Sequence, residues 1–374
     1  MATAKINKLI KYIDDELKTN NNESETKNDS ESFTNIVLGA GNPLLDISCS
    51  VDKDFLKKYD LKPANAILAD ATKHATLYDE LSKMNDVEYI AGGATLNSIR
   101  VCQWMLQNSG KTGYMGCIGN DKYGKLLQES VKKDGVNCNF MIHKTVPTGT
   151  CAVCITNKER SLVANLAAAN EYSAEETKTD KSKYLVKNAG VIYNAGFFIT
   201  VSPETLIYYA KECQTKNIPY CINFSAPFIV TVPPFLKTLL TLMEYATHVF
   251  TNDDEIKAFA NSNKIKYNDI SDLALKISKM TSKRNEGRKV ICTQGKDPII
   301  IAYNNKIIKY NVPLLKAQDI VDLNGAGDAF VGGYLSQLIK GKNDNICVDA
   351  GNYAARYIIQ TSGTKLTGKP TFVP

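Results

Sequence analysis

A glycine-rich segment that ends in an aspartate carries the clearest chemical signal of this sequence. Residues Asp322 to Asp328 read Asp-Leu-Asn-Gly-Ala-Gly-Asp, and apolar residues then recur at helical spacing as far as Ile339. The pattern predicts a helix that starts at Asp328, preceded by a tight loop over 325–327. Unpaired amide groups and the positive end of the helix dipole attract anions at such a place. A phosphate group would suit this loop.

Asp328 has two interpretations. A carboxylate at the start of a helix can be no more than a cap. It can also accept a proton from a hydroxyl that attacks a phosphorus atom. Phosphoryl transfer needs an oriented nucleophile, a proton acceptor and donors that face the charged oxygens. This segment supplies the last two within four residues, so the residues favour phosphoryl transfer and leave the capping interpretation open.

The elements that must position this segment alternate between short apolar runs and helical patterns. Such alternation predicts an α/β fold with a doubly wound sheet. Between about 138 and 165 the pattern changes to adjacent strands, which predicts a hairpin-rich lid beside the main sheet. We expect buried strands at 36–38, 191–193, 220–222, 248–250 and 290–292, and helices at 95–108, 124–134, 203–215 and 253–260.

Composition and charge disfavour several classes of protein. The chain has 374 residues, 44% of them hydrophobic, and a net charge of +6 that is spread along its length. A large core is therefore expected, and nucleic acid is not an expected partner. No apolar run reaches bilayer length, and lysines interrupt the N-terminal apolar residues, so we expect neither a membrane span nor a signal peptide. The expected compartment is the cytoplasm, with the nucleus as an alternative.

Cysteine usage supports that expectation. The ten cysteines sit at irregular positions, which is typical of reduced thiols in an intracellular protein. Cys151 and Cys154 form the single CxxC pattern, within an apparent strand whose residues three apart point to opposite faces. We interpret them as buried thiols, with a metal or redox site as the weaker alternative.

The segment from Asp322 to Asp328 resembles the C-terminal signature of the ribokinase-like family of carbohydrate and nucleoside kinases. The stretch Ala91-Gly-Gly-Ala-Thr-Leu-Asn97 resembles the N-terminal diglycine motif of this family, and Gly41-Asn-Pro-Leu-Leu-Asp46 resembles its adenosine kinase branch. The likeness extends over about 37–364. It implies a large doubly wound α/β domain over 33–374 with a small β-rich lid, which draws on 44–68, 90–97 and 138–166. Residues 1–32, which include a polar stretch at 19–32, are expected to form a disordered, partly helical extension.

The resemblance also implies an activity: transfer of the γ-phosphoryl group of Mg-ATP to the 5′-hydroxyl of adenosine, giving AMP and ADP. In this family the last aspartate of the signature is the general base and the glycine loop is the anion hole. These roles fall to Asp328 and to Gly325, Ala326 and Gly327. Arg160, in the expected lid, would neutralise the moving phosphoryl group.

Ligand contacts follow from the same resemblance. Asn252 and Glu255 match a motif that organises Mg²⁺ and phosphate through water. The residues expected at adenosine are Asn42, Leu44, Asp46, Gly92, Gly93, Asn97, Leu162, Ala164 and Phe198. Those expected at ATP are Asn223, Thr293, Gly295, Asn324, Gly327 and Asn352.

Several alternatives stay open at this point. Gly92 and Gly93 alone would be an ordinary turn, and the acidic residues at 253–255 could simply stabilise a helix N-terminus. The stretch Ala94-Thr-Leu96 and Asn352 depart from the family pattern, which leaves base selectivity and nucleotide affinity undecided. The alternative functions are an inosine, guanosine or sugar kinase, or a catalytically silent relative. The family further implies a monomer and activation by K⁺.

Overall fold

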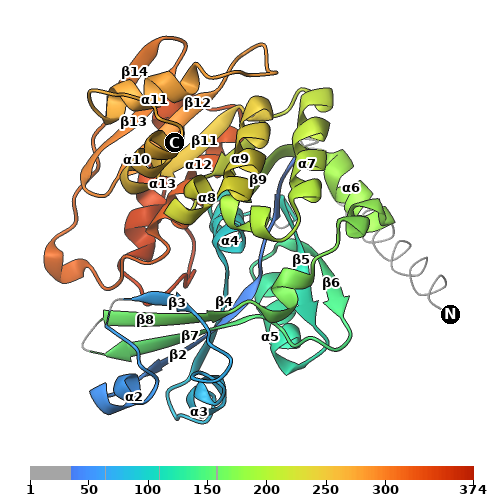
Figure 1. The fold of residues 1–374 in the computed structure, drawn as a ribbon, viewed down its shortest axis with the longest axis vertical. Coiled ribbons are helices and arrows are strands. Elements are labelled where there is room, and N and C mark those ends of the chain that lie inside the picture. The colour runs from blue at the N-terminus through green and yellow to red at the C-terminus, as the bar shows by residue number, and fades with distance from the viewer. Residues whose placement is uncertain (1–34, 64, 109, 157–158) are drawn as a thin grey trace, which may run out of the picture. The chain divides into compact units, whose positions relative to one another are not determined.

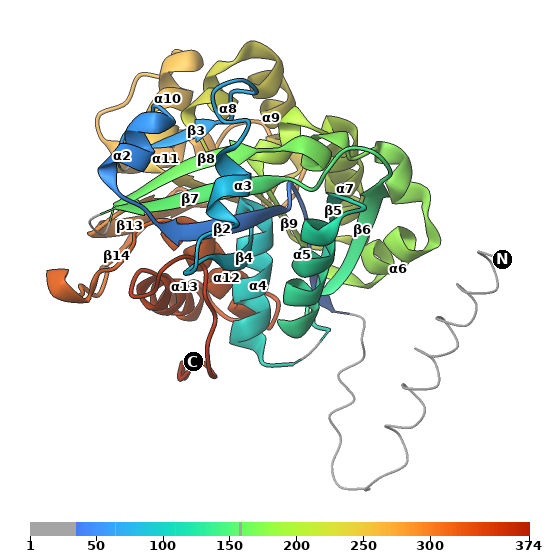
Figure 2. The same cartoon turned by 90° about the horizontal axis from the view of Figure 1, so that it is seen from below.

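Two β-sheets organise the residues that the structure, a computed structural model, describes: 35–63, 65–108, 110–156 and 159–374 (Figures 1 and 2). The chain separates into two units, Met1–Ser32 and Phe33–Pro374, and every described residue belongs to the second unit. The extension predicted over 1–32 therefore lies outside the described residues.

The larger sheet has nine strands. Their order is β14 (Lys306–Tyr310), β13 (Asp297–Tyr303), β12 (Lys289–Gln294), β11 (His248–Asn252), β10 (Tyr220–Asn223), β9 (Ala189–Ala195), β1 (Ile36–Ala40), β5 (Thr112–Gly119) and β6 (Asn137–His143). The strands from β12 to β6 run parallel, and β13 and β14 add antiparallel strands at one edge. The chain goes from β1 to β5 and β6 on one side and returns to β9 on the other side of β1. In open α/β sheets, ligands bind at the carboxyl ends of the strands where the order reverses in this way.

Helices cover both faces of this sheet (Figure 1). Each buried strand is apolar on both sides: Val37 of β1 packs into one core cluster, whereas Ile36 and Leu38 pack into the other. The first cluster is closed by α4 (Ala94–Leu106), α5 (Lys122–Lys133), α12 (Ala326–Leu338) and α13 (Asp344–Ile358). The second is closed by α6 (Asp180–Asn188), α7 (Pro203–Lys216), α8 (Pro227–Thr231), α9 (Pro233–Tyr245), α10 (Asp253–Ser262) and α11 (Ile270–Ser278).

The smaller sheet has five strands, in the order β3 (Ala66–Leu68), β8 (Glu159–Asn165), β7 (Thr150–Thr156), β2 (Leu44–Ser50) and β4 (Glu88–Gly92). Because β2 starts four residues after β1 ends, this sheet begins at the carboxyl end of the nine-stranded sheet. Its outer face carries α2 (Lys53–Lys58) and α3 (Leu77–Leu81), which pack with Ile47, Cys49 and Cys154 (Figure 1). Residues at alternate positions, such as Asp46 and Cys151, therefore lie on its inner face.

The predicted elements of the main domain are present. Strands β1, β9, β10, β11 and β12 lie on the five predicted strands, and α4, α5, α7 and α10 lie on the four predicted helices. One prediction about the lid is wrong. The lid segment expected over 138–166 includes β6, but β6 pairs parallel with β5 at the edge of the nine-stranded sheet. Periodicity reveals a strand but not its partner, so the boundary was placed too early.

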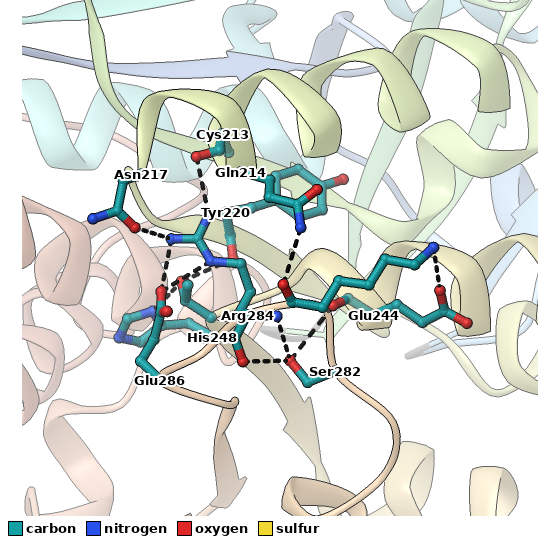
Figure 3. Close-up of polar contacts among 11 residues, drawn as sticks. Cys213, Gln214, Asn217, Tyr220, Glu244, His248, Ser282, Arg284 and Glu286 are labelled. Carbon is teal, nitrogen blue, oxygen red and sulfur yellow. Dashed lines mark hydrogen bonds and ion pairs between the residues drawn. The ribbon is translucent and has the colours of Figure 1, made fainter.

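The amino ends of β10 and β11 lie at the opposite end of the sheet, where a loop is anchored by polar contacts (Figure 3). The buried Arg284 guanidinium donates to the Cys213 carbonyl oxygen over 3.0 Å and pairs with Glu286 over 2.6 Å. Ser282 Oγ accepts a hydrogen bond from the Arg284 amide over 3.1 Å. These contacts tie the segment between α11 and β12 to the end of α7, and they stabilise the scaffold at a distance from the carboxyl ends.

Candidate active site

A cavity lies where the carboxyl ends of the parallel strands meet the first turn of α12. Asn223 ends β10, Asn252 ends β11 and Thr293 lies near the end of β12, and all three line this cavity. The remaining lining residues are Ala94, Phe197, Ser225, Phe250, Thr251, Glu255, Gly325, Gly327, Asp328, Phe330 and Val331. The topology of the sheet thus brings together residues that are more than two hundred positions apart in the chain.

The glycine loop and Asp328 form the start of α12. Gly325 is the N-cap residue in the left-handed conformation, with φ 79°, and the helix begins at Ala326, two residues earlier than predicted. The amides of this first turn have no acceptor within the helix. Apart from its chain neighbours and the backbone of α12, no atom of the described residues lies within 4 Å of where a Cβ on Gly327 would stand, so an anion has room to approach this turn.

Asp328 is not a capping residue. Within the described part of the chain no side chain caps α12, and the Asp328 carboxylate instead accepts a hydrogen bond of 3.1 Å from Asn97 Nδ2. Asn97 lies on α4, so a side chain 231 positions away orients this carboxylate. The capping alternative left open by the sequence is therefore wrong for this residue.

Burial controls the acidity of Asp328. Although its surface is partly accessible at the cavity, the carboxylate is enclosed by protein, and this burial raises its pKa from 3.8 to about 7. Glu255 raises the pKa further by repulsion, and the Asn97 hydrogen bond opposes both effects. A carboxylate with a pKa near 7 is matched to accept a proton from a hydroxyl at neutral pH.

Asp46 faces the same region from the smaller sheet. Burial raises its pKa to about 7, while Arg100 and Arg160 lower it and Asp328 raises it. The two aspartates therefore lie close enough to influence each other. An ionised Asp46 has two acceptor oxygens, which suits a pair of neighbouring hydroxyls.

Two glycines make room for this arrangement. A Cβ on Gly92 would stand 2.6 Å from Asp46 Oδ1, so any side chain would displace the carboxylate. Gly93 has φ 101°, and a Cβ there would stand 2.2 Å from the Asn42 carbonyl oxygen. The diglycine is thus not an ordinary turn, because its lack of side chains is required beside Asp46 and Asn42.

Asn252 and Glu255 form a capping box at the start of α10. Asn252 Oδ1 accepts from the Glu255 amide over 2.8 Å, and the two Glu255 oxygens accept from the backbone amide and side chain of Asn252 over 3.0 and 2.9 Å. The helix-terminus interpretation of this segment is therefore correct in part. Both residues also line the cavity, and burial raises the pKa of Glu255 to about 7.

A divalent cation fits this site only loosely. Among the described residues no group of three or more His, Cys, Asp or Glu side chains is placed to hold a metal. Since the Glu255 oxygens are occupied by Asn252, an ion would be held through water and through a bound phosphate. The water-mediated magnesium site at Asn252 and Glu255 stays a prediction.

Arg160 is not free in the cavity. It lies on β8, and its Nε is 3.0 Å from Asp322 Oδ2, with both side chains buried. Its Nη2 contacts the Ser362 hydroxyl. The guanidinium expected to neutralise a phosphoryl group is thus engaged by the main domain.

The structure places the remaining predicted residues in different surroundings. Leu44, Leu162 and Ala164 alternate with outer-face residues, so they lie on the inner face of the smaller sheet beside Asp46. Phe198 is fully buried and packs against Tyr172, so it belongs to the core. Its neighbour Phe197 lines the cavity instead.

Three residues expected at ATP do not line the cavity. Gly295 forms the turn between β12 and β13, with φ 60°. Asn324 is exposed and donates to Asp322 Oδ1 over 3.0 Å. Asn352 is buried on α13, and its Nδ2 has no hydrogen-bond partner among the described residues.

Sequence reasoning assigned no role to two residues that matter here. Ser225 lines the cavity with φ 69°, a strained conformation for a residue with a side chain, and its Oγ accepts from the Gly196 amide over 2.8 Å. Asp322 pairs with Arg160. The residue type serine does not reveal that its φ is positive, and the partner of Asp322 is far away in the sequence.

Comparison with known proteins places these features in a family. The family model of pfkB family carbohydrate kinases matches residues 54–371. Adenosine kinase 2 of Arabidopsis thaliana is 45% identical over 344 residues, which cover 92% of this chain and 99% of the relative. The adenosine kinase of Anopheles gambiae, solved in complex with P1,P4-di(adenosine-5) tetraphosphate, is 41% identical with a TM-score of 0.81, over 90% of this chain and 99% of that one. The adenosine kinase of Schistosoma mansoni in complex with 2-fluoroadenosine is 34% identical with a TM-score of 0.82, over 92% and 100% of the two chains.

Proposed function

Since the chain belongs to the pfkB family of carbohydrate kinases and to its adenosine kinase branch, we propose that it transfers the γ-phosphoryl group of ATP to the 5′-hydroxyl of adenosine. The products are AMP and ADP, so the reaction recycles a purine nucleoside. The observation that carries the proposal is Asp328, a carboxylate with a pKa of about 7 that is oriented by Asn97 at the glycine-rich start of α12.

The nucleoside binds between the two sheets at the carboxyl end of β1. The Asp46 carboxylate accepts hydrogen bonds from the ribose hydroxyls, and Gly92 and Gly93 allow the backbone to approach the sugar. Leu44 and the inner-face residues of β8 surround the base. Closure of the smaller sheet excludes water, which protects ATP from hydrolysis.

Asp328 then accepts the proton of the 5′-hydroxyl as this oxygen attacks the γ-phosphorus. The first-turn amides of α12 donate to the charged oxygens. A magnesium ion, when bound, neutralises phosphate charge, and Asn252 and Glu255 would hold it through water. Asn223 and Thr293 line the path of the phosphates.

The proposed function includes a location and an oligomeric state. The chain is expected to act in the cytoplasm as a monomer. All ten cysteines are free, nine of them buried, which suits a reducing compartment. No helix of the described residues is long and apolar enough to cross a membrane. Activation by K⁺ stays a prediction.

The test measures phosphoryl transfer from Mg-ATP to adenosine, inosine, guanosine, ribose and fructose. We expect a strong preference for adenosine. Turnover on another acceptor alone would keep the mechanism and overturn the substrate. No turnover on any acceptor would indicate a catalytically silent relative. In the same assay, Asp328→Asn should lose nearly all turnover and still bind adenosine, and near-normal turnover would refute the base assignment.

A further inference from the structure

A buried arginine lies on α4, the helix whose Asn97 orients Asp328. This residue is Arg100, one turn after Asn97, and 4% of its surface is exposed. Its Nε lies 2.5 Å from Asp134 Oδ2 at the carboxyl end of α5. Its Nη1 donates to the Ala91 carbonyl oxygen over 2.5 Å. These two contacts, which come from different elements, hold the guanidinium in one place.

The guanidinium of Arg100 lies against the strand that encloses Asp46. Ala91 belongs to β4, an edge strand of the smaller sheet, and it directly precedes Gly92. A Cβ on Gly92 would stand 2.6 and 2.7 Å from the two carboxylate oxygens of Asp46. The backbone that Arg100 holds is therefore continuous with the backbone that touches this carboxylate. Arg100 places a buried positive charge beside that backbone.

Asp46 needs nearby positive charge to stay ionised. Burial raises its pKa to about 7, while Arg100 lowers the pKa and Arg160 lowers it less. The other titratable groups that face Asp46 are the Asp328 carboxylate, which raises the pKa, and the Cys151 thiol on the neighbouring strand β7. An ionised carboxylate accepts hydrogen bonds with both oxygens, whereas a protonated one must also donate. The ionised form is therefore the better acceptor for two ribose hydroxyls.

The charge of Arg160 is neutralised more fully than that of Arg100. Arg160 pairs with Asp322, and the exposed fractions of these two side chains are 8% and 5%. The carboxylate partner of Arg100 is Asp134, whose side chain is 19% exposed. Because water screens the more exposed carboxylate, Asp134 offsets less of the charge beside it. Arg100 is thus the stronger support for an ionised Asp46.

We propose that Arg100 is a positioning residue for the nucleoside: its fixed charge keeps the Asp46 carboxylate able to accept hydrogen bonds from the ribose hydroxyls. The inference rests on the proposed function, in which Asp46 binds the ribose. Arg100 acts through Asp46 and does not touch the nucleoside. The helix α4 therefore serves both reacting partners, because Asn97 orients the general base and Arg100 supports the carboxylate that holds the sugar.

Adenosine binding at two pH values tests this role. Calorimetry on the full chain without nucleotide gives the Kd at pH 7 and at pH 9.5. Arg100→Gln should weaken binding about tenfold at pH 7, because loss of the charge leaves more of Asp46 protonated. At pH 9.5 the loss should be less than about twofold, since the carboxyl ionises there in both proteins. Equal losses at the two pH values would mean that Arg100 only holds β4, and they would overturn the proposal, as would unchanged binding.

Arg284 provides a matched control at the opposite end of the nine-stranded sheet (Figure 3). It is also buried, pairs with a carboxylate of Glu286 over 2.6 Å and donates to the Cys213 carbonyl oxygen over 3.0 Å. Arg284→Gln should lower stability and keep the Kd for adenosine within about twofold of wild type at both pH values. A tenfold loss confined to pH 7 would show that any buried arginine has this effect, and would overturn the specific role of Arg100.

Arg100→Lys separates charge from shape. Lysine keeps the positive charge and lacks the planar fork of donors. We expect adenosine binding within about threefold of wild type at both pH values. If Arg100→Gln does not fold, this variant decides the question, because a loss of tenfold or more at either pH would overturn the proposal.

The binding assay also separates this inference from the proposed function. Wild-type protein that binds adenosine without phosphorylating it would refute the proposed function, and the two Kd values would still decide the role of Arg100. Wild-type protein that phosphorylates adenosine, together with Arg100→Gln that binds as wild type does, would overturn the role of Arg100 alone. Wild-type protein that does not bind adenosine would overturn both.

Discussion

Replacing Asp328 by asparagine should stabilise the fold at alkaline pH while it abolishes turnover. Burial raises the pKa of this carboxyl from 3.8 to about 7, so keeping it ionised in the folded chain above pH 7 lowers the free energy of unfolding. An amide removes this cost. Asn97 Oδ1 is buried without a hydrogen-bond partner among the described residues, and an amide at position 328 could donate to it.

The size and sign of the effect follow from the two pKa values. Below pH 4 the carboxyl is protonated in both the folded and the unfolded chain, so its acidity does not affect stability. Between pH 4 and pH 7 the unfolded chain ionises while the folded chain holds its proton, and wild-type stability falls. Above pH 7 the loss is complete, at roughly 4 kcal/mol. The advantage of Asp328→Asn should therefore grow by roughly 2 to 3 kcal/mol from pH 5 to pH 8.

Urea unfolding of wild type and Asp328→Asn at pH 5 and pH 8 measures this change. Asp180→Asn, which alters an exposed aspartate in the first turn of α6, serves as the control and should show no comparable growth. An equal advantage of Asp328→Asn at both pH values, or a loss of stability at pH 8, would refute the burial argument. Retained turnover would refute the catalytic role separately.

Three further predictions use the same geometry. The kcat/KM for adenosine should fall at least about tenfold from pH 8 to pH 6, because Asp46 and Asp328, each with a pKa of about 7, must both be ionised; a flat profile over this range would contradict that requirement. Gly92→Ala should raise the KM for adenosine by about 100-fold or more, since its Cβ would overlap the Asp46 carboxylate, and calorimetry that finds wild-type affinity would exclude the predicted contact. Arg288→Met should cost about 3 to 5 kcal/mol of unfolding free energy with kcat unchanged, because the buried guanidinium donates to carbonyl oxygens that include those of Met243 and Ile277; chemical denaturation with the exposed Lys296→Met as control decides this.

Local sequence patterns were sufficient to predict much of the fold. The runs of β1, β9 and β12 are apolar on both faces, and a strand with this pattern has few alternatives to burial in a parallel sheet. The stripe after Asp328 likewise predicted α12 with an error of two residues at its start. The partner of β6 could not be found this way, because periodicity describes one strand and pairing depends on two.

The sequence likewise predicted some residues of the candidate site and could not predict others. Residue type and spacing marked Asp328, the 325–327 loop and the acidic helix start at 253–255, since each depends on neighbours within a few positions. Residue type could not tell whether Phe197 or Phe198 faces the cavity, because the short 3-10 helix Gly196–Thr200 that follows β9 decides it.

The sequence by itself determined the alternation of strands and helices, the glycine-rich helix start and the resemblance to a kinase family, all of which depend on local spacing. Only the tertiary structure decided what surrounds each charge. It brought Asn97 to Asp328, enclosed Asp46 behind Gly92 and paired Arg160 with Asp322. A pKa near 7 and a buried ion pair arise from desolvation and from partners distant in the chain, and neither is encoded in the spacing of nearby residues.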